Sequence, residues 1–340
     1  MKCWPTSSME KNRPLCVLLG CAALLLVSLA LSLCLGAVRL SPAQLLEGVL
    51  DASTVSGRIL WHTRLPRMLA TLFAGCALAA SGVLIQTVLG NPLAGPNIIG
   101  VNAGAGFAVA LLSAFTPLTA TLTPMAAFLG ALAAMLLVYF AARATGASRV
   151  TLVLAGVAVA SLLNAGTDAV VTLIPDALPG SSSFRIGGVE GASMVQLRPA
   201  IVYIALGLLA AFALRPAMDV LALGDETAQS LGLRVEPVRF ALLLTAALLA
   251  GAAVSFAGLI GFVGLIVPHA ARALLGGRGK LLLPTAVLLG GAFLTLCDVL
   301  GRVIFAPYEL PVGIVLSFIG CPFFLFLLAR RKGGHARDRA

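Results

Sequence analysis

The segment from residue 64 to residue 104 constrains the fold of this chain more than any other part. It begins with a charged Arg-Leu-Pro-Arg step and continues as an apolar stretch rich in alanine and glycine. This stretch breaks at Asn91-Pro92, and a second apolar stretch begins after Pro96. Lipid leaves no partner for an exposed backbone group, and small residues let helices approach closely. We therefore expect two tightly packed membrane helices joined by a short turn.

The composition supports the same conclusion for the whole chain. Of 340 residues, 60% are hydrophobic and 11% are charged, whereas soluble domains carry about 25% charged residues. The net charge of +10 could suggest nucleic acid, but no basic stripe interleaves with aromatic residues. Lys and Arg also set the orientation of membrane proteins. We expect membrane lipid, and no nucleic acid, to surround this chain.

The apolar stretches predict about ten membrane spans, since a spanning helix needs about 20 apolar residues. The first stretch is too long for the usual apolar core of a signal peptide, and no clear cleavage site follows it. The break near Gly258 is the weakest boundary, because the apolar run hardly pauses there. The expected spans are 15–38, 65–88, 97–115, 120–142, 150–174, 197–215, 236–257, 258–275, 281–304 and 311–329.

An even number of spans places both termini on one side of the membrane. With the termini in the cytoplasm, most of the 23 Lys and Arg residues lie inside, as the positive-inside rule requires. Two longer polar segments, 39–63 and 175–198, then lie outside, and each could hold a short interfacial helix. The main cytoplasmic connection is 216–235.

A shift of 176 residues brings parts of the chain into register with themselves. We interpret this echo as an inverted repeat within one transmembrane domain, residues 1–340, with halves of about 65–174 and 236–329. Such repeats are common in transporters, with the pathway near their interface; the alternative is chance matching in an Ala/Gly-rich chain. The matches are Ala74-Gly75 with Ala250-Gly251, Ala77 with Ala253, Gly82 with Gly258, Pro92 with Pro268, and Gly100 with Gly276.

Motifs of catalysis and metal binding are not found in the sequence. There is no GxxxxGK[ST] phosphate loop, because Leu281 follows the lysine of 276–280, and no HExxH or GxSxG motif. The seven cysteines form no CxxC pair, and His269 stands alone as an expected structural histidine. We expect no catalytic residue, metal or cofactor in this chain.

Two acidic residues, Asp168 and Asp298, lie within or beside apolar runs, where a charge is by default a functional candidate. Arg302 follows Asp298 by four residues, on the same helix face, which predicts an ion pair at the outer end of that span. Asp168 either lines an aqueous pathway or pairs with a neighbour, and the sequence leaves both open.

The cytoplasmic segment contains a short polar helix between two glycines, Gly224 and Gly232. Asp225 or Glu226 falls in its first turn, where an acid suits the helix dipole. The spacing fits a solvated connecting helix and a coupling helix for an ATPase partner equally well.

From about Leu40 to Arg331, the chain resembles the permease subunits of the ATP-driven importers for iron-siderophores, haem and cobalamin. The resemblance implies an all-α polytopic fold with about ten transmembrane helices, of the type II ABC importer permease kind, in the bacterial cytoplasmic (inner) membrane. The matching segments are 64–104, 221–233, 254–272, 282–284, 297–302 and 309–328.

The resemblance also implies an assembly. A second copy of the chain would complete a homodimer with one translocation path at its interface. Two ATPase subunits would bind ATP and Mg²⁺ below it, and a periplasmic or lipid-anchored substrate-binding protein would dock above it.

Particular residues take roles through the same resemblance. The ATPase contact matches seven residues: Gly224, Asp225, Glu226, Thr227, Ala228, Leu231 and Gly232. The arginines that meet glutamates of the binding protein match Arg64, Arg67 and Arg302, so Arg302 would serve both Asp298 and the partner. The inner gate, at the start of the fifth span, matches Ala147 and Ser148.

The predicted function is that of a permease subunit that moves an iron chelate, a ferric siderophore or haem, by alternating access driven by a separate ATPase. Cobalamin is the alternative cargo. An ion-coupled secondary transporter would need more embedded acids or bases than Asp168 and Asp298. A membrane enzyme would need a polar cluster on facing helices. The chain itself is not expected to hydrolyse ATP.

Overall fold

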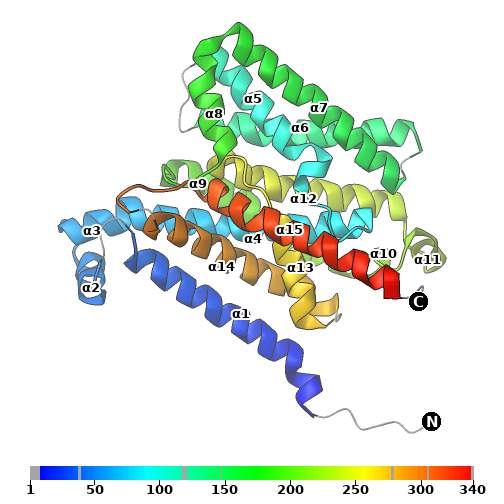
Figure 1. Ribbon diagram of the computed structural model, residues 1–340, viewed down its shortest axis with the longest axis horizontal. Helices are drawn as coiled ribbons and strands as arrows, with labels where there is room; N and C mark the ends of the chain where they lie inside the picture. The colour runs from blue at the N-terminus through cyan, green and yellow to red at the C-terminus, as the bar shows by residue number, and fades with distance from the viewer. Residues whose placement is uncertain are drawn as a thin grey trace.

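The structure is a computed structural model that describes residues 8–36, 40–116, 121–146, 148–276, 279–304 and 306–337. Within these residues it is helical almost throughout, and the long helices lie side by side (Figure 1). Each of the ten predicted spans overlaps one apolar helix. These are α1 (Ser8–Cys34), α4 (Leu65–Leu89), α5 (Val101–Phe115), α6 (Leu122–Ala144), α7 (Arg149–Leu173), α9 (Met194–Ala213), α12 (Val235–Ala257), α13 (Val263–Leu275), α14 (Leu282–Val303) and α15 (Val312–Arg337).

The polytopic fold predicted from the sequence is therefore confirmed. Seven candidate spans are long and apolar enough to cross a membrane, and three shorter apolar helices, 101–115, 263–275 and 312–327, complete the set among the described residues. The expected break near Gly258 is also present. Helix α12 ends at Ala257, and Gly258 adopts a φ of 66°, which glycine tolerates far better than other residues.

The remaining helices lie at the two ends of the bundle. We name these the α8 end and the α11 end after one helix at each (Figure 1). The α8 end carries α2 (Pro42–Leu50), α3 (Val55–Ile59) and α8 (Leu178–Ile186), as the outer segments predicted. The α11 end carries α10 (Arg215–Leu221) and α11 (Asp225–Ser230), together with the start of α1 and the end of α15.

Helices α4 and α12 form the centre of the bundle. Of their most apolar windows, 83% and 78% is buried, against 22% for α7. Helix α4 achieves this with glycine at its contact points. A Cβ atom on Gly75 would collide with the carbonyl oxygen of Gly290 in α14, and one on Gly82 with that of Gly264 in α13. The alanine- and glycine-rich stretch within 64–104 therefore provides, at Gly75 and Gly82, the close helix contact that the sequence predicts.

The inverted repeat stays a prediction. Its proposed halves contain helices in matching order, since α4 to α7 and α12 to α15 each run long, short, long, long. Residues that the 176-residue shift matches do not always lie in the same kind of secondary structure. Pro92 lies in a turn after α4, whereas Pro268 lies inside α13.

We predict that Gly82→Ala destabilises the fold, because the added methyl meets backbone that cannot rotate away. Overpacking of this kind costs about 1–3 kcal/mol, visible as a lower unfolding temperature of the protein in detergent. Gly20→Ala in α1 is the matched control, since nothing lies within 4 Å of its Cβ position. Equal unfolding temperatures for the two variants would contradict the packing argument.

Candidate functional site

The short polar helix predicted at the α11 end is present as α11. Its flanking glycines have positive φ angles, 104° at Gly224 and 85° at Gly232, so both turns suit glycine. The acids Asp225 and Glu226 occupy its first turn. The glycine-bracketed spacing read from the sequence therefore corresponds to a real structural unit.

The residues of this segment divide by exposure. Glu226 and Thr227 are exposed, and the side chain of Leu231 is 64% exposed, whereas Ala228 is buried against the bundle. The seven matched residues therefore do not share one face. Glu226, Thr227 and Leu231 are the members of the set that face outward.

Asp225 faces the bundle and bridges two helices. One carboxylate oxygen accepts from Arg149 at the start of α7 at 2.8 Å, and the other from Arg239 of α12 at 2.6 Å. Arg239 also pairs with Glu236 at 2.7 Å. Two hydrogen-bonded arginines on one carboxylate make a strong, directional contact. Helix α11 is thus fastened to α7 and α12 through a single side chain.

These contacts set the ionisation of Asp225. Partial burial raises its pKa, but the hydrogen bond from Arg149 and the charge of Arg239 outweigh burial and hold the pKa below its ordinary value of 3.8. The carboxylate is therefore ionised at neutral pH, as the bridge requires.

Charged side chains also gather at the α8 end, in what we call the α8-end cluster: Arg64, Arg67, Asp298, Arg302 and Glu309. Asp298 pairs with Arg67 at 2.9 Å and with Arg302 at 3.0 Å. Arg67 also binds Glu309 at 2.5 Å. The ion pair between Asp298 and Arg302 expected from their spacing is confirmed, and Arg67 is its third member.

The cluster holds the end of α1 as well. Arg302 donates to the Ser32 hydroxyl at 2.9 Å and to the Leu35 carbonyl at 3.1 Å, and Arg64 also donates to the Leu35 carbonyl. The three arginines are only 5%, 5% and 2% exposed. In the single chain their guanidinium groups make buried contacts between helices. The Glu309 side chain, which is 30% exposed, is the member of the α8-end cluster that solvent reaches.

Asp168 of α7 pairs with Arg185 of α8 at 3.6 Å, with side chains 71% and 58% exposed. The sequence left open whether Asp168 lines an aqueous pathway or pairs with a neighbouring residue, and the structure shows the pair with Arg185. A pair this exposed contributes little to stability.

The two matched gate residues are only partly covered by the structure. Ala147 lies outside the described residues. Ser148 is the N-cap of α7, where its hydroxyl accepts from the Thr151 backbone at 3.1 Å.

His269 packs its ring against Phe323 of α15, with the ring centroids 5.8 Å apart. Among the described residues, no cluster of His, Cys, Asp or Glu could hold a metal.

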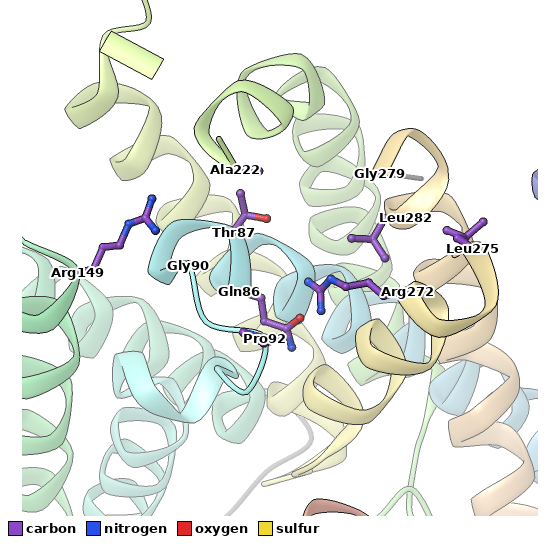
Figure 2. Close-up of a pocket in the computed structure, with 10 residues that line it drawn as sticks. All are labelled: Gln86, Thr87, Gly90, Pro92, Arg149, Ala222, Arg272, Leu275, Gly279 and Leu282. Carbon is purple, nitrogen blue, oxygen red and sulfur yellow. The ribbon is translucent and has the colours of Figure 1, made fainter. Parts of the chain in front are cut away.

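A pocket of about 340 Å³ opens at the α11 end, beside the segment that carries Asp225 (Figure 2). Gln86 and Thr87 of α4, Arg149 of α7 and Arg272 of α13 supply its polar groups. Ala222, just after α10, also lines the pocket. The pocket therefore borders both the bundle core and the α10–α11 connection.

Sequence reasoning missed Arg149, Arg239 and Glu309 as site residues. Arg149 and Asp225 are 76 residues apart, and Arg67 and Glu309 are 242 apart, so no local spacing links them. Only Arg239, three residues after Glu236, carried a helical pairing signal.

Comparisons with known proteins agree with this architecture. The chain is 38% identical over 321 residues to the ferric enterobactin transport system permease protein FepD of Escherichia coli, covering 93% of this chain and 96% of FepD. It is also 38% identical to the hemin transport system permease protein HmuU of Yersinia pestis, with 93% and 96% covered.

A solved structure described as an inward-facing conformation of a metal-chelate type ABC transporter superposes with a TM-score of 0.83. Its sequence is 28% identical, and the match covers 92% of this chain and 99% of that one. The family model of the FecCD transport family matches residues 24–330. That match spans nearly every helix described above, so this chain is a multi-pass membrane protein of the FecCD transport family.

Proposed function

We propose that this chain is the permease subunit of an ATP-binding-cassette importer and carries an iron chelate, a ferric siderophore or haem, across the bacterial inner membrane. The observation that carries the proposal is the α11 segment. It presents an exposed acid, Glu226, on a helix that Asp225 fastens to α7 and α12. The bridge gives an exposed helix a direct connection to two long helices, as a contact that transmits movement from a partner requires.

In this mechanism, α11 is the contact for a separate ATPase that binds ATP and Mg²⁺. Glu226, Thr227 and Leu231 meet the ATPase, while Asp225 and Ala228 hold α11 on the bundle. Movement of the ATPase then reaches α7 through Arg149 and α12 through Arg239. Nucleotide can shift the permease between its outward-open and inward-open states only if the assembly binds nucleotide with different affinity in each. That difference reaches the membrane helices only through α11, so a stiff connection from α11 to α7 and α12 transmits it better than a loose one.

The partner copy in a homodimer would cover α7 and α15. These helices expose large apolar side chains, among them Leu154 at 63%, Leu162 at 67% and Phe318 at 76%. The pathway would then run along α7, with Asp168 beside it and the gate at Ala147 and Ser148. The α11 end, with both chain termini, faces the cytoplasm in this arrangement, in keeping with the positive-inside rule.

A periplasmic or lipid-anchored binding protein would dock at the α8 end. Arg64, Arg67 and Arg302 are buried, so we propose that they influence docking indirectly. Their charges contribute to the electrostatic potential at the α8 end, and Arg67 holds the loop that contains Tyr308 and Glu309. Three arginines face the carboxylates of Asp298 and Glu309, and Glu190 also interacts electrostatically with Arg67. We propose that the partner surface complements the accessible charges at this end.

The cargo assignment rests on the relatives. FepD and HmuU are named for ferric enterobactin and hemin, and cobalamin remains the alternative cargo for the same role. A secondary transporter is disfavoured, because one of the two acids it would use, Asp298, is held by two arginines within the α8-end cluster.

The experiment that tests the proposal reconstitutes the permease in liposomes with its ATPase and binding protein. Binding protein loaded with ferric siderophore, haem or cobalamin is then compared for stimulation of ATP hydrolysis and for uptake. Stimulation by an iron chelate supports the proposal, and stimulation by cobalamin alone would replace the cargo. If no ATPase associates, the importer assignment is wrong.

For the coupling contact, we predict that Glu226→Arg folds normally but abolishes ATPase association, since it reverses an exposed charge facing a basic groove on the partner. Co-purification with the ATPase measures this directly. Glu47→Arg makes the same charge change on an exposed position of α2 at the opposite end and should co-purify as the wild type does. Normal association of Glu226→Arg would remove Glu226 from the contact.

For the bridge, we predict that Asp225→Asn lowers the unfolding temperature at neutral pH. The pKa of Asp225 is depressed in the folded state, so its stabilisation is present above the ordinary pKa of 3.8 and is lost as the pH falls through the lowered value. The difference between wild type and variant should therefore shrink on the acid side. A difference that stays constant with pH would contradict this linkage.

For docking, Glu309→Gln should tighten binding of an acidic surface of the binding protein, because it removes the accessible negative charge beside Arg67. The effect should be largest at low salt, where exposed charges are least screened. Tyr308→Phe, in the same exposed loop, is the uncharged control. Equal affinities of Glu309→Gln and wild type at low salt would argue against electrostatic docking at this end.

A further inference from the structure

Arg272 has no carboxylate partner among the described residues, although it lies partly buried in the last turn of α13. Its Nη1 atom is inaccessible to solvent and makes no hydrogen bond. Two other arginines at this end, Arg149 and Arg239, both bind Asp225. A buried charge without a counter-ion is costly, so the site of Arg272 is electrostatically incomplete.

Gln86 lines the same pocket and has a buried acceptor oxygen that receives no hydrogen bond. Its side chain is 3% exposed, and its Nε2 atom donates to the carbonyls of Ala94 at 3.1 Å and Gly264 at 3.2 Å. Those two bonds fix the amide, which leaves Oε1 buried without a donor. Figure 2 shows the Gln86 amide and the Arg272 guanidinium turned toward each other at the edge of the pocket.

The two orphaned atoms define the chemistry of an occupant. Nη1 of Arg272 needs an acceptor and a negative charge, whereas Oε1 of Gln86 needs a donor. Water offers a donor and an acceptor but no charge, and a sulfate, a phosphodiester or an ionised carboxylate offers charge but no proton. Inorganic phosphate has both at neutral pH. A phosphate monoester, whose second pKa is about 6, is mostly dianionic there, and its protonated fraction has both.

We propose that this pocket binds a phosphate group that keeps a proton, either inorganic phosphate or the monoester headgroup of a lipid such as phosphatidic acid. Arg272 binds the phosphate oxygens through its planar fork, and Gln86 accepts the remaining P–O–H proton. Thr87 and Arg149 border the same space, and the pocket volume of about 340 Å³ leaves room for water or an acyl-linked glycerol. Basic pockets between membrane helices bind lipid headgroups in this way.

The proposal is independent of transport and is tested on the purified permease alone. In detergent, inorganic phosphate should raise the unfolding temperature more than sulfate or chloride at equal ionic strength. In lipid nanodiscs, phosphatidic acid should do so more than phosphatidylglycerol, whose phosphate is a diester. A response in the first arm alone identifies free phosphate as the ligand, and a response in the second alone identifies a lipid.

Arg272→Gln should weaken the phosphate response by roughly tenfold in affinity, the loss expected for a charge-assisted hydrogen bond. Lys280→Gln removes a nearby exposed charge and should leave the response unchanged. Thr87→Glu is the second variant, should Arg272→Gln fail to fold. It places a carboxylate at the pocket wall and should abolish the response by competing for Arg272.

Three results would overturn the proposal. One is equal stabilisation by phosphate, sulfate and chloride together with no preference for phosphatidic acid. Another is a full phosphate response in both Arg272→Gln and Thr87→Glu. The third is loss of ATPase binding by Arg272→Gln without any phosphate response in the wild type, which would assign the pocket to the ATPase.

Discussion

Backbone contact along α4 is the constraint on which the rest of this structure depends. Lipid provides no hydrophobic drive between helices, so association relies on close packing. Gly75 and Gly82 let α4 touch the backbones of α14 and α13 directly. Helix α12 packs on the same core through Ser81, whose hydroxyl donates to the Ala246 carbonyl at 2.8 Å. The outer helices are arranged around that fixed centre.

Ion pairs hold together the helix ends that lie outside this closely packed centre. At the α8 end, Asp298 and its arginines join the ends of α1, α4 and α14. At the α11 end, Asp225 joins α11 to α7 and α12. The first joint is buried, whereas the second is partly exposed at Asp225 and Arg149. The chain thus combines a buried joint at one end with a partly exposed joint at the end that we propose contacts the ATPase.

The helices could be predicted from sequence because each carries its own signal in apolar length and flanking glycines. The same holds for the turn at Gly224 and for the pair of Asp298 with Arg302, which lie one helical turn apart. The bridge from Arg149 to Asp225 could not be predicted, since 76 residues separate its members. Burial of Arg67 also escaped prediction, because an arginine at a span end is equally plausible as a surface charge until its partner, 231 residues away, is known.

We propose that Asp225 and Arg149 act as one link between α7 and the proposed ATPase contact on α11. A double-mutant cycle of Arg149→Gln and Asp225→Asn, read as uptake per ATP hydrolysed in reconstituted importer, tests it most directly. We expect strong non-additivity, with the double variant losing hardly more coupling than either single variant. Losses that simply add would show that the two residues act separately and would contradict the link.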